Sequence, residues 1–332
     1  MNKNNLILLV FLVLFQGAFA QVQVKRDTVL MGSHFDFTVV AQSDFEADKN
    51  INLVIAEVVR IENLISDWKE SSEVSEINRN AGIKPIKVSK EVFELTKRAL
   101  HFSEITSGAF DITTASMEKI WSFDGLMDEL PKQEAIQKSI EKVGYKKILL
   151  NEDDSTVFLT QNGMRIGFGA TGKGYAADKG RELMLKLEIK GGIVNASGDL
   201  TSWGVQADRK SWKIGLKDPF KMGGILKTFP VRYAAMCTSG DYQKFAFVDG
   251  KRYSHIMNPK TGIPASGLTS VTVLGPEAEA ANGFSTSIMV LGTEAGLKLL
   301  ESYPDYGCLI ITEEGDIITS KNYKKVLKKL NQ

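Results

Sequence analysis

The chain has 332 residues and carries 41 lysine and arginine residues against 40 aspartate and glutamate residues. A chain so nearly balanced has no general electrostatic affinity for nucleic acid or for an anionic membrane, so an anionic partner must be held by a local site. Two cysteines are too few for a disulfide scaffold or a cysteine-rich zinc site, and 43% hydrophobic with 24% charged residues is typical of a globular protein.

The N-terminal segment, residues 1–20, has the order of a secretory signal. Lys3 is followed by an apolar run over residues 6–15 and then by Ala18-Phe19-Ala20, an Ala-x-Ala cleavage site. The run is shorter than the roughly 20 apolar residues that span a bilayer, although an uncleaved anchor is the alternative. Cleavage would leave a mature chain of residues 21–332 with no nearby cysteine for lipid attachment. We therefore expect an exported protein, periplasmic or otherwise extracytoplasmic, without a lipid anchor.

Apolar periodicity and turn residues divide the rest of the chain into helices and strands. In chain order, we expect paired strands over 22–40, a helix over 45–68, a second helix that begins after the N-cap Ser89, and a third between 131 and 144. Strands then follow over 148–276, interrupted by a helix over about 174–187. A long helix over 277–291, a short helix and a closing strand over 309–312 complete the chain. Runs of helices and runs of strands without regular alternation predict an α+β fold rather than a doubly wound parallel sheet.

Two smaller features have an open or simple interpretation. Cys237 and Cys308 lie in apolar strand-like runs, which is compatible with a disulfide in an oxidising compartment or with two buried thiols. The lysine-rich segment 321–329 predicts a solvated helix face.

The glycine-rich segment 167–174 matches two phosphate-binding templates, G-x-G-x-x-G and G-x-x-x-x-G-K ending at Lys173. Neither named fold is supported, because Gly174 replaces the Ser or Thr of a P-loop and the chain lacks the regular βαβ series of a dinucleotide fold. After a strand predicted over 164–168, however, glycine N–H groups, a helix N-terminus and Lys173 are together suited to an anion. The alternative is a glycine-rich turn needed only for tight packing.

Two further clusters carry polar side chains. His255, one of three histidines, ends a predicted strand beside the turn-forming segment Asn258-Pro259-Lys260-Thr261-Gly262, with Asp241 some residues earlier. A lone histidine is more often a structural hydrogen-bonding residue than a catalytic one. Asn282 and Thr286 are four residues apart in a predicted helix and share a face, so their oxygens suit a hard cation such as Mg²⁺, with phosphate supplying other ligands. A helix-packing contact is the alternative.

Taken together, these segments resemble the ApbE-type FAD:protein FMN transferase family. The resemblance extends from about residue 29 to residue 310 and rests on many short motifs in the same order, which makes it far more specific than any single glycine pattern. The motifs, as they stand in this chain, are Met31-Gly32-Ser33, Ser66-Asp67-Trp68, residues 72–78, residues 107–113, residues 173–178, Ser197-Gly198-Asp199, Ser239-Gly240-Asp241-Tyr242 and the segment around His255.

The resemblance implies an α+β fold of two T-fold-like halves, with antiparallel sheets and packed helices, that forms one catalytic unit over residues 21–332. It also implies a Mg²⁺-dependent reaction. The FAD pyrophosphate is cleaved, FMN is attached through a phosphoester bond to a threonine hydroxyl of an acceptor protein, and AMP is released. The implied acceptors are proteins of extracytoplasmic or membrane-bound redox complexes.

The resemblance assigns the site residues as well. His255 and Asp241 are the catalytic candidates that activate the acceptor hydroxyl, and the histidine is better matched to neutral pH. The positions implied to contact FAD are Met31, Trp68 (by stacking on a ring), Ala109, Phe110, Asp111, Gly167, Lys173 (at the phosphates) and Ile256 (in the flavin pocket). The implied metal positions are Ala170, through its carbonyl, Asn282 and Thr286.

Three positions depart from the family pattern, which usually has Asp where this chain has Gly167, Asn258 and Asn282. The Asn282 carbonyl is neutral and should hold Mg²⁺ less tightly than a carboxylate, although it is an oxygen ligand of the right hardness. Gly167 removes an expected contact to the nucleotide. These departures leave two alternatives to the transferase: a non-catalytic FAD-binding carrier, and a pyrophosphatase that hydrolyses FAD to FMN and AMP.

Overall fold

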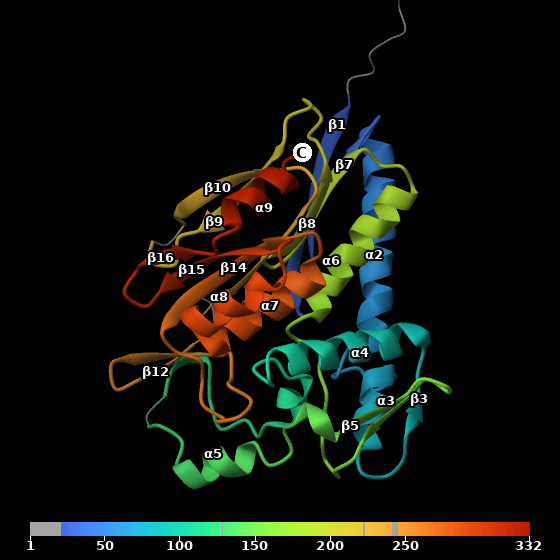
Figure 1. Ribbon diagram of the computed structural model, residues 1–332. Helices are drawn as coiled ribbons and strands as arrows, with labels where there is room; N and C mark the ends of the chain where they lie inside the picture. Colours follow the sequence, from blue (N-terminus) through green and yellow to red (C-terminus); the bar gives the residue numbers. More distant parts are fainter. Residues whose placement is uncertain (1–20, 128, 222, 241–244) are drawn as a thin grey trace, which may run out of the picture.

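The computed structural model describes residues 21–127, 129–221, 223–240 and 245–332. Within these residues the largest sheet has eight strands, each antiparallel to its neighbours, in the order β1-β2-β7-β8-β11-β14-β15-β16 (Figure 1). Its strands are β1 (Val22–Leu30), β2 (Ser33–Ala41), β7 (Gly191–Ala196), β8 (Asp199–Gly204), β11 (Ala234–Gly240), β14 (Leu268–Gly275), β15 (Gly307–Thr312) and β16 (Ile317–Thr319). The antiparallel sheet and its packed helices confirm the predicted α+β class.

Helices cover one face of this sheet in two groups. α2 (Asp44–Ile65) and α6 (Gly172–Lys186) pack on the half that contains β1, β2, β7 and β8. α7 (Ala278–Leu291) and α8 (Thr293–Glu301) pack on the half that contains β11, β14 and β15. α6 packs against both α2 and α7 and so joins the two halves, as Figure 1 shows.

The opposite face is covered by a second apolar cluster. It lies under the hairpin of β9 (Trp212–Lys217) and β10 (Ile225–Val231) and under α9 (Tyr323–Leu330). The lysines of α9 are exposed, which confirms the solvated face predicted over 321–329, but Tyr323, Val326 and Leu330 of the same helix are buried. The C-terminal helix therefore also closes this side of the sheet.

The remaining elements form a smaller layer in the lower part of Figure 1. They are α3 (Glu73–Arg79), β3 (Ile86–Lys87), α4 (Lys90–Ile105), a 3₁₀-helix over Ile112–Ser116, β4 (Asp124–Leu126), α5 (Gln133–Ser139), a 3₁₀-helix over Tyr145–Lys147, β5 (Ile148–Asn151), β6 (Thr156–Leu159), β12 (Phe245–Val248) and β13 (Lys251–Ser254). β12 pairs in parallel with β4, so two segments far apart in the sequence are joined here.

The β1–β2 hairpin, predicted over 22–40, turns at Met31 and Gly32. Both residues have positive φ, 51° and 66°, as a two-residue turn between strongly twisted strands requires. A Cβ added at Gly172 would lie 3.6 Å from Met31 Cε, so the tip of the hairpin reaches the start of α6. The turn therefore brings Met31 to the glycine-rich segment.

The helices predicted from apolar spacing are confirmed as α2, α4, α6 and α7. Their caps follow local chemistry: Ser43 Oγ accepts a hydrogen bond from Glu46 N at the start of α2, and Ser89 Oγ accepts one from Val92 N at the start of α4. The seven-residue α3 was not predicted, since so short a segment shows little periodicity, although Ser72 caps it in the same way.

The strand predicted over 164–168 is wrong. This segment pairs with none of the described strands, because its backbone groups bond instead to Asn78, Ser116 and the carbonyl of Ile112. Asn78 Nδ2 donates to the carbonyl of Ile166 at 3.0 Å, and Asn78 Oδ1 accepts from the N–H of the same residue at 2.8 Å. One amide side chain thus satisfies a buried piece of backbone that apolar pattern alone assigns to a sheet.

The two cysteines are free and buried. Cys237 on β11 and Cys308 on β15 both lie opposite Val273 of the intervening strand β14. Neighbouring strands are about 4.8 Å apart, so the two Cα atoms are about 10 Å apart, beyond the about 7 Å that a disulfide allows. Of the two alternatives, the structure therefore has buried thiols.

The predicted signal segment, residues 1–20, lies outside the described residues, and its cleavage remains a prediction. In the part of the chain that the structure describes, none of the helices combines the length and the apolarity needed to cross a membrane.

Candidate functional site

A large cavity opens between the sheet, its helices and the smaller layer. Its volume is about 1410 Å³, above the roughly 300–1,000 Å³ of ordinary small-ligand pockets, which leaves room for a large ligand. All the predicted site residues that the structure describes line it: Met31, Trp68, Ala109, Phe110, Asp111, Gly167, Ala170, Lys173, His255, Ile256, Asn282 and Thr286. Asp241 lies outside the described residues. The fold thus brings together, in one cavity, residues that are far apart in the sequence.

Trp68 lies at the cavity in the loop that follows α2. Ser66 Oγ accepts hydrogen bonds from the backbone N–H groups of Trp68 and Lys69, which fixes the loop. The Trp68 residue is 77% exposed, and Lys119 Nζ lies 5.1 Å from its ring centroid. An indole with this exposure has area available for stacking on an aromatic ring of a ligand.

Asp111 forms part of the wall, but its carboxylate is occupied within the protein. Its oxygens accept hydrogen bonds from Thr113 N, Thr113 Oγ1 and Tyr145 N. Burial raises the pKa of the Asp111 carboxyl, and these hydrogen bonds oppose the shift. Phe110, the preceding residue, packs against Phe102 with the ring centroids 5.7 Å apart. These two side chains therefore shape the wall.

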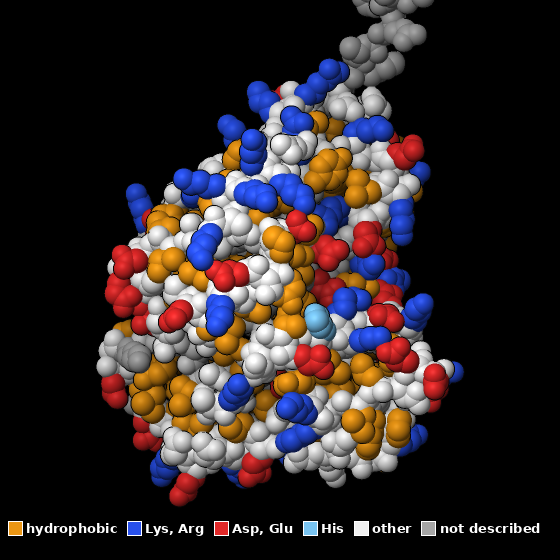
Figure 2. Space-filling model, viewed as in Figure 1, with side chains coloured by type: hydrophobic (Ala, Val, Ile, Leu, Met, Phe, Trp, Pro, Cys, Tyr) orange, Lys and Arg blue, Asp and Glu red, His pale blue; other side chains and the backbone are white. Residues whose placement is uncertain are grey.

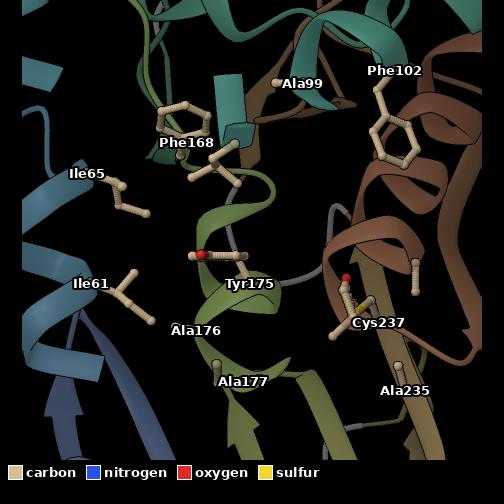
Figure 3. Packing of buried hydrophobic residues seen from close by; sticks show 14 of the residues in the cluster. Ile61, Ile65, Ala99, Phe102, Phe168, Tyr175, Ala176, Ala177, Ala235 and Cys237 are labelled. Atoms are coloured by element: carbon tan, nitrogen blue, oxygen red, sulfur yellow. Dashed lines mark hydrogen bonds between the residues drawn. The ribbon is translucent and has the colours of Figure 1, made fainter. Parts of the chain in front are cut away.

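The glycine-rich segment leads into α6 and is anchored by Phe168. Figure 3 shows the Phe168 ring close to Ile65 of α2, and both belong to the main hydrophobic core. The N–H of Gly172 donates to the Phe168 carbonyl at 2.7 Å, which turns the chain into the helix. α6 has no side-chain cap, and the buried Thr171 hydroxyl has no hydrogen-bond partner within the described residues. The uncapped N-terminus of α6 is thus suited to an anion.

Lys173 adds a full positive charge in the first turn of α6. Its Nζ lies 3.3 Å from the Gly169 carbonyl oxygen and 3.5 Å from Asp199 Oδ2. The lysine side chain is 23% exposed, whereas that of Asp199 is 5% exposed. The ammonium group therefore bridges the loop and a buried carboxylate at the cavity.

Asn282 and Thr286 share a face of α7, as predicted. Thr286 Oγ1 donates to Asn282 Oδ1 at 3.2 Å, and Ser239 Oγ on β11 lies 3.3 Å from the Thr286 hydroxyl. Among the described residues there is no group of three or more His, Cys, Asp or Glu side chains that could hold a metal ion. The oxygens shown together here belong to an amide and to hydroxyl groups, and such oxygens fit a hard cation such as Mg²⁺ when a ligand supplies further oxygens.

Asp199 was part of a recognised motif, but no role was predicted for it. It begins β8 directly after Ser197 and Gly198, which have φ of 57° and 103°, and it lines the cavity. Burial raises the pKa of its carboxyl, and Lys173 and the Asn282 side chain oppose the shift. The Ser-Gly-Asp motif marks the position in the sequence, but the burial and the contacts of the carboxylate are visible only in the folded chain.

His255 follows β13 directly, as predicted, and lines the cavity. The next residue, Ile256, is fixed through its backbone: its N–H donates to Ser254 Oγ at 3.1 Å, and its carbonyl accepts from Ala265 N at 2.8 Å. Ile256 also packs on the main core. The histidine is therefore carried on a well-fixed segment of chain.

The structure accounts for two of the departures from the family pattern. A Cβ at Gly167 would lie 3.2 Å from Ala115 Cβ and 3.5 Å from Asp67 Oδ2, so another carboxylate already lies beside this position. Asn258 Oδ1 accepts a hydrogen bond from Lys260 N, an Asx turn that either Asn or Asp can form. Neither departure removes a feature that the local structure needs.

A second cleft, of about 690 Å³, lies between α2, α4, α6 and α7. Its charged side chains bond to one another, as in the pairs of Arg60 with Glu91 and of Arg98 with Glu279. Figure 2 shows both signs of charge mixed over the middle and lower parts of the visible face, with mostly Lys and Arg in its upper part. We therefore place the functional site in the larger cavity.

Asp178 of α6 caps the N-terminus of α7 from outside that helix. α7 lacks a side-chain cap of its own, and Asp178 Oδ2 accepts a hydrogen bond from Glu279 N at 2.9 Å. Its other oxygen lies 3.0 Å from Arg181. Burial raises the pKa of Asp178 to about 6, against the opposing effects of Arg181 and the α7 N–H groups.

This shift makes stability depend on pH. The folded protein holds the Asp178 proton more tightly than the unfolded chain does, so the stabilisation is complete below about pH 4 and is lost as the pH rises through about 6. Between pH 4 and 7.5, wild type should therefore lose about 2.5 kcal/mol relative to Asp178→Asn in urea unfolding. Asp316→Asn, which changes an exposed aspartate, is the control. An unchanged difference between wild type and Asp178→Asn at the two pH values would contradict the assignment.

The comparisons with known proteins identify the family of this chain. Residues 31–310 match the ApbE family. The FAD:protein FMN transferase of Klebsiella pneumoniae (strain 342) is 29% identical over 88% of this chain and 90% of that protein, and that of Treponema pallidum (strain Nichols) is 30% identical over 75% and 73%. The crystal structure of the ApbE protein from Thermotoga maritima superposes with a TM-score of 0.83 at 30% identity, covering 92% of this chain and 99% of that one.

The fold is that of the flavin-transferase class of enzymes. The chain belongs to the ApbE family. The resemblance found in the sequence is therefore confirmed.

Proposed function

We propose that this chain is an FAD:protein FMN transferase that uses Mg²⁺ and attaches FMN to a threonine hydroxyl of an acceptor protein. The observation that carries the proposal is that one cavity gathers every described residue for which the family resemblance implies a role. Membership of a family whose curated relatives are named FAD:protein FMN transferases supports the same reaction.

The anionic part of FAD is its pyrophosphate, and the cavity offers positive charge to bind it. Lys173 and the uncapped N–H groups of α6 bind and orient the phosphates. Asn282, Thr286 and the Ala170 carbonyl would hold Mg²⁺, which when bound neutralises charge that develops on the phosphate oxygens. Trp68 stacks on a ring of the dinucleotide, and Ile256 lines the flavin pocket.

The transfer step balances as a substitution at phosphorus. The acceptor threonine oxygen bonds to the phosphorus of the FMN half, the bond from that phosphorus to the bridging oxygen breaks, and AMP leaves. His255 accepts the hydroxyl proton as the oxygen attacks. Asp241 is the second candidate for this role, and it lies outside the described residues.

Incubation of the protein with FAD, Mg²⁺ and a threonine-bearing acceptor tests the reaction. We expect the acceptor to gain the mass of FMN less water, AMP to appear in equal amount, and both products to vanish with a chelator. Stoichiometric FAD binding without AMP or adduct would instead identify a carrier. AMP and free FMN without adduct would identify a pyrophosphatase. Either outcome overturns the transferase proposal.

The partners and the compartment are part of the proposal. The signal-like segment 1–20 supports export, so the acceptors are proteins of extracytoplasmic or membrane-bound redox complexes. Mass spectrometry of the mature protein from a cell-envelope fraction should give a chain that begins at Gln21. An intact N-terminus in the cytosol would contradict export.

Trp68→Ala is expected to weaken FAD binding, because stacking of a base on an aromatic side chain contributes about 1–3 kcal/mol. Fluorescence titration with FAD should show dissociation constants raised about 5- to 100-fold. Parallel titrations with ADP and FMN tell which half contacts Trp68, since only one of them should weaken. Phe220→Ala, which removes an exposed aromatic outside the cavity lining, is the control. Unchanged FAD binding by Trp68→Ala would contradict stacking.

Asn282→Asp is expected to tighten Mg²⁺ binding, because it adds a charge to the ligand set. The gain should be about tenfold in calorimetric titrations with ADP present. The control is Glu294→Gln, which changes the charge of an exposed residue on the next helix, α8. If Asn282→Asp leaves the metal affinity unchanged, Asn282 is not a ligand.

A further inference from the structure

We propose that Asp199 is the positioning residue of the cation site: it orients the Asn282 amide and holds Lys173 until an anionic ligand takes that lysine. The inference rests on the proposed function, because it concerns the same cavity. It gives Asp199 a role that couples the anion side of the cavity to its cation side.

The first support is the position of the Asp199 carboxylate. It lies between the two parts of the site, 3.5 Å from Lys173 Nζ on the phosphate side and in hydrogen-bond contact with the Asn282 side chain on the cation side. Asp199 is 4% exposed, so water screens these interactions poorly. The turn before it is fixed by the Gly198 N–H, which donates to Asn195 Oδ1 at 2.9 Å.

The second support is the hydrogen-bond chemistry of Asn282. Its Oδ1 accepts from the Thr286 hydroxyl, and an ionised carboxylate can only accept, so the Asn282 NH₂ group is the one that faces Asp199. This arrangement keeps the amide oxygen on the Thr286 side of α7, where the cation ligands lie. A group behind a ligand that fixes its orientation typically changes metal affinity by about 10–100-fold.

The other carboxylates that line the cavity form ion pairs or hydrogen bonds away from the cation side: Asp36 with Lys25, Glu62 with Lys69, Asp67 with Arg165, and Asp111 with Thr113 and Tyr145. Asn282 and Thr286 are neutral. Asp199 is therefore the described carboxylate that supplies negative charge next to them.

A coupling between the two ligands follows. Without a ligand, Asp199 and Lys173 neutralise each other. When a diphosphate draws the ammonium away, the Asp199 charge is left to the cation side, so the anion strengthens cation binding and the cation strengthens anion binding. Asp199 therefore weakens anion binding in the absence of metal and strengthens metal binding in the presence of the anion.

Asp199→Asn tests this with the full chain and ADP as the probe. Without metal, the variant should bind ADP about 3- to 10-fold more tightly than wild type; with saturating ADP, it should bind Mg²⁺ about 10-fold more weakly. A merely structural role would weaken both. Glu62→Gln removes a carboxylate that lines the same cavity and pairs with Lys69 rather than with Lys173, and it should change neither affinity by more than about twofold.

A second variant keeps the test decisive if Asp199→Asn folds poorly. Lys173→Met should raise the affinity of the nucleotide-free protein for Mg²⁺, because Asp199 then lacks its ammonium partner. The role of Asp199 is overturned if Asp199→Asn binds ADP no more tightly than wild type does. It is also overturned if Lys173→Met binds Mg²⁺ no more tightly than wild type does. Neither readout uses FMN transfer, so an inactive wild type that shows the expected affinities overturns only the proposed function.

Discussion

Lys173→Met is expected to lower kcat/KM for FMN transfer by about 10²- to 10³-fold, because the ammonium group neutralises phosphate charge inside a cavity. It should also lower the free energy of unfolding by about 2 kcal/mol, since it leaves the buried Asp199 without its ion-pair partner. The expected loss of unfolding free energy is smaller than for a fully buried ion pair, because the Lys173 side chain is 23% exposed. Steady-state AMP release and urea unfolding measure the two effects.

The two effects of Lys173→Met can be separated. The double variant Lys173→Met with Asp199→Asn should regain most of the stability, because it removes the unpaired Asp199 charge. It should regain none of the activity, because the Lys173 charge is still absent. Lys179→Met, on the same helix and paired with Glu182, should keep kcat/KM within about twofold of wild type. A Lys173→Met enzyme with wild-type kcat/KM would show that this lysine does not contact the phosphates.

Gly174→Ala is expected to lower the free energy of unfolding by about 3 kcal/mol through overpacking. The new Cβ would lie 2.5 Å from the Ala278 carbonyl oxygen and 3.0 Å from Glu279 N, and these backbone atoms cannot move aside as a flexible side chain can. α7 must then move away from α6, which separates Asn282 and Thr286 from the glycine-rich segment. We therefore expect Mg²⁺ binding with ADP to weaken by at least about tenfold.

Gly169→Ala is the matched control in the same segment, because nothing lies within 4 Å of its added Cβ. Its unfolding free energy should change by less than about 0.5 kcal/mol. Urea unfolding of both variants decides the matter. Equal stabilities for Gly174→Ala and wild type would mean that the two helices do not meet as closely as the structure shows.

Much of the fold was predictable because it depends on neighbours in sequence. The hairpin turn at Met31 and Gly32, the Ser89 cap and the shared face of Asn282 and Thr286 all follow from backbone preference and helical spacing. The strand predicted over 164–168 failed for the opposite reason. The backbone of Ile166 in this segment is satisfied by Asn78, a side chain far away in the sequence that no periodicity can reveal.

Gly174 shows the same division within one motif. From the sequence, this glycine only argued against a P-loop, because it replaces a Ser or Thr. The structure explains why a glycine is needed at this position: the first turn of α6 lies in close contact with the start of α7. Asp178, one turn later, caps α7 across the same contact. Both roles depend on a helix that lies far along the chain.

The sequence by itself determined the α+β class and the family, because ordered short motifs and local periodicity carry that information, and all twelve of its described candidate site residues line the cavity. The balanced charge of the chain also required any anion site to be local. Only the tertiary structure decided which charge serves which ligand. Asp199 lies between Lys173 and Asn282 because β8, α6 and α7 pack together, and a low-exposure contact among three elements leaves no trace in local sequence.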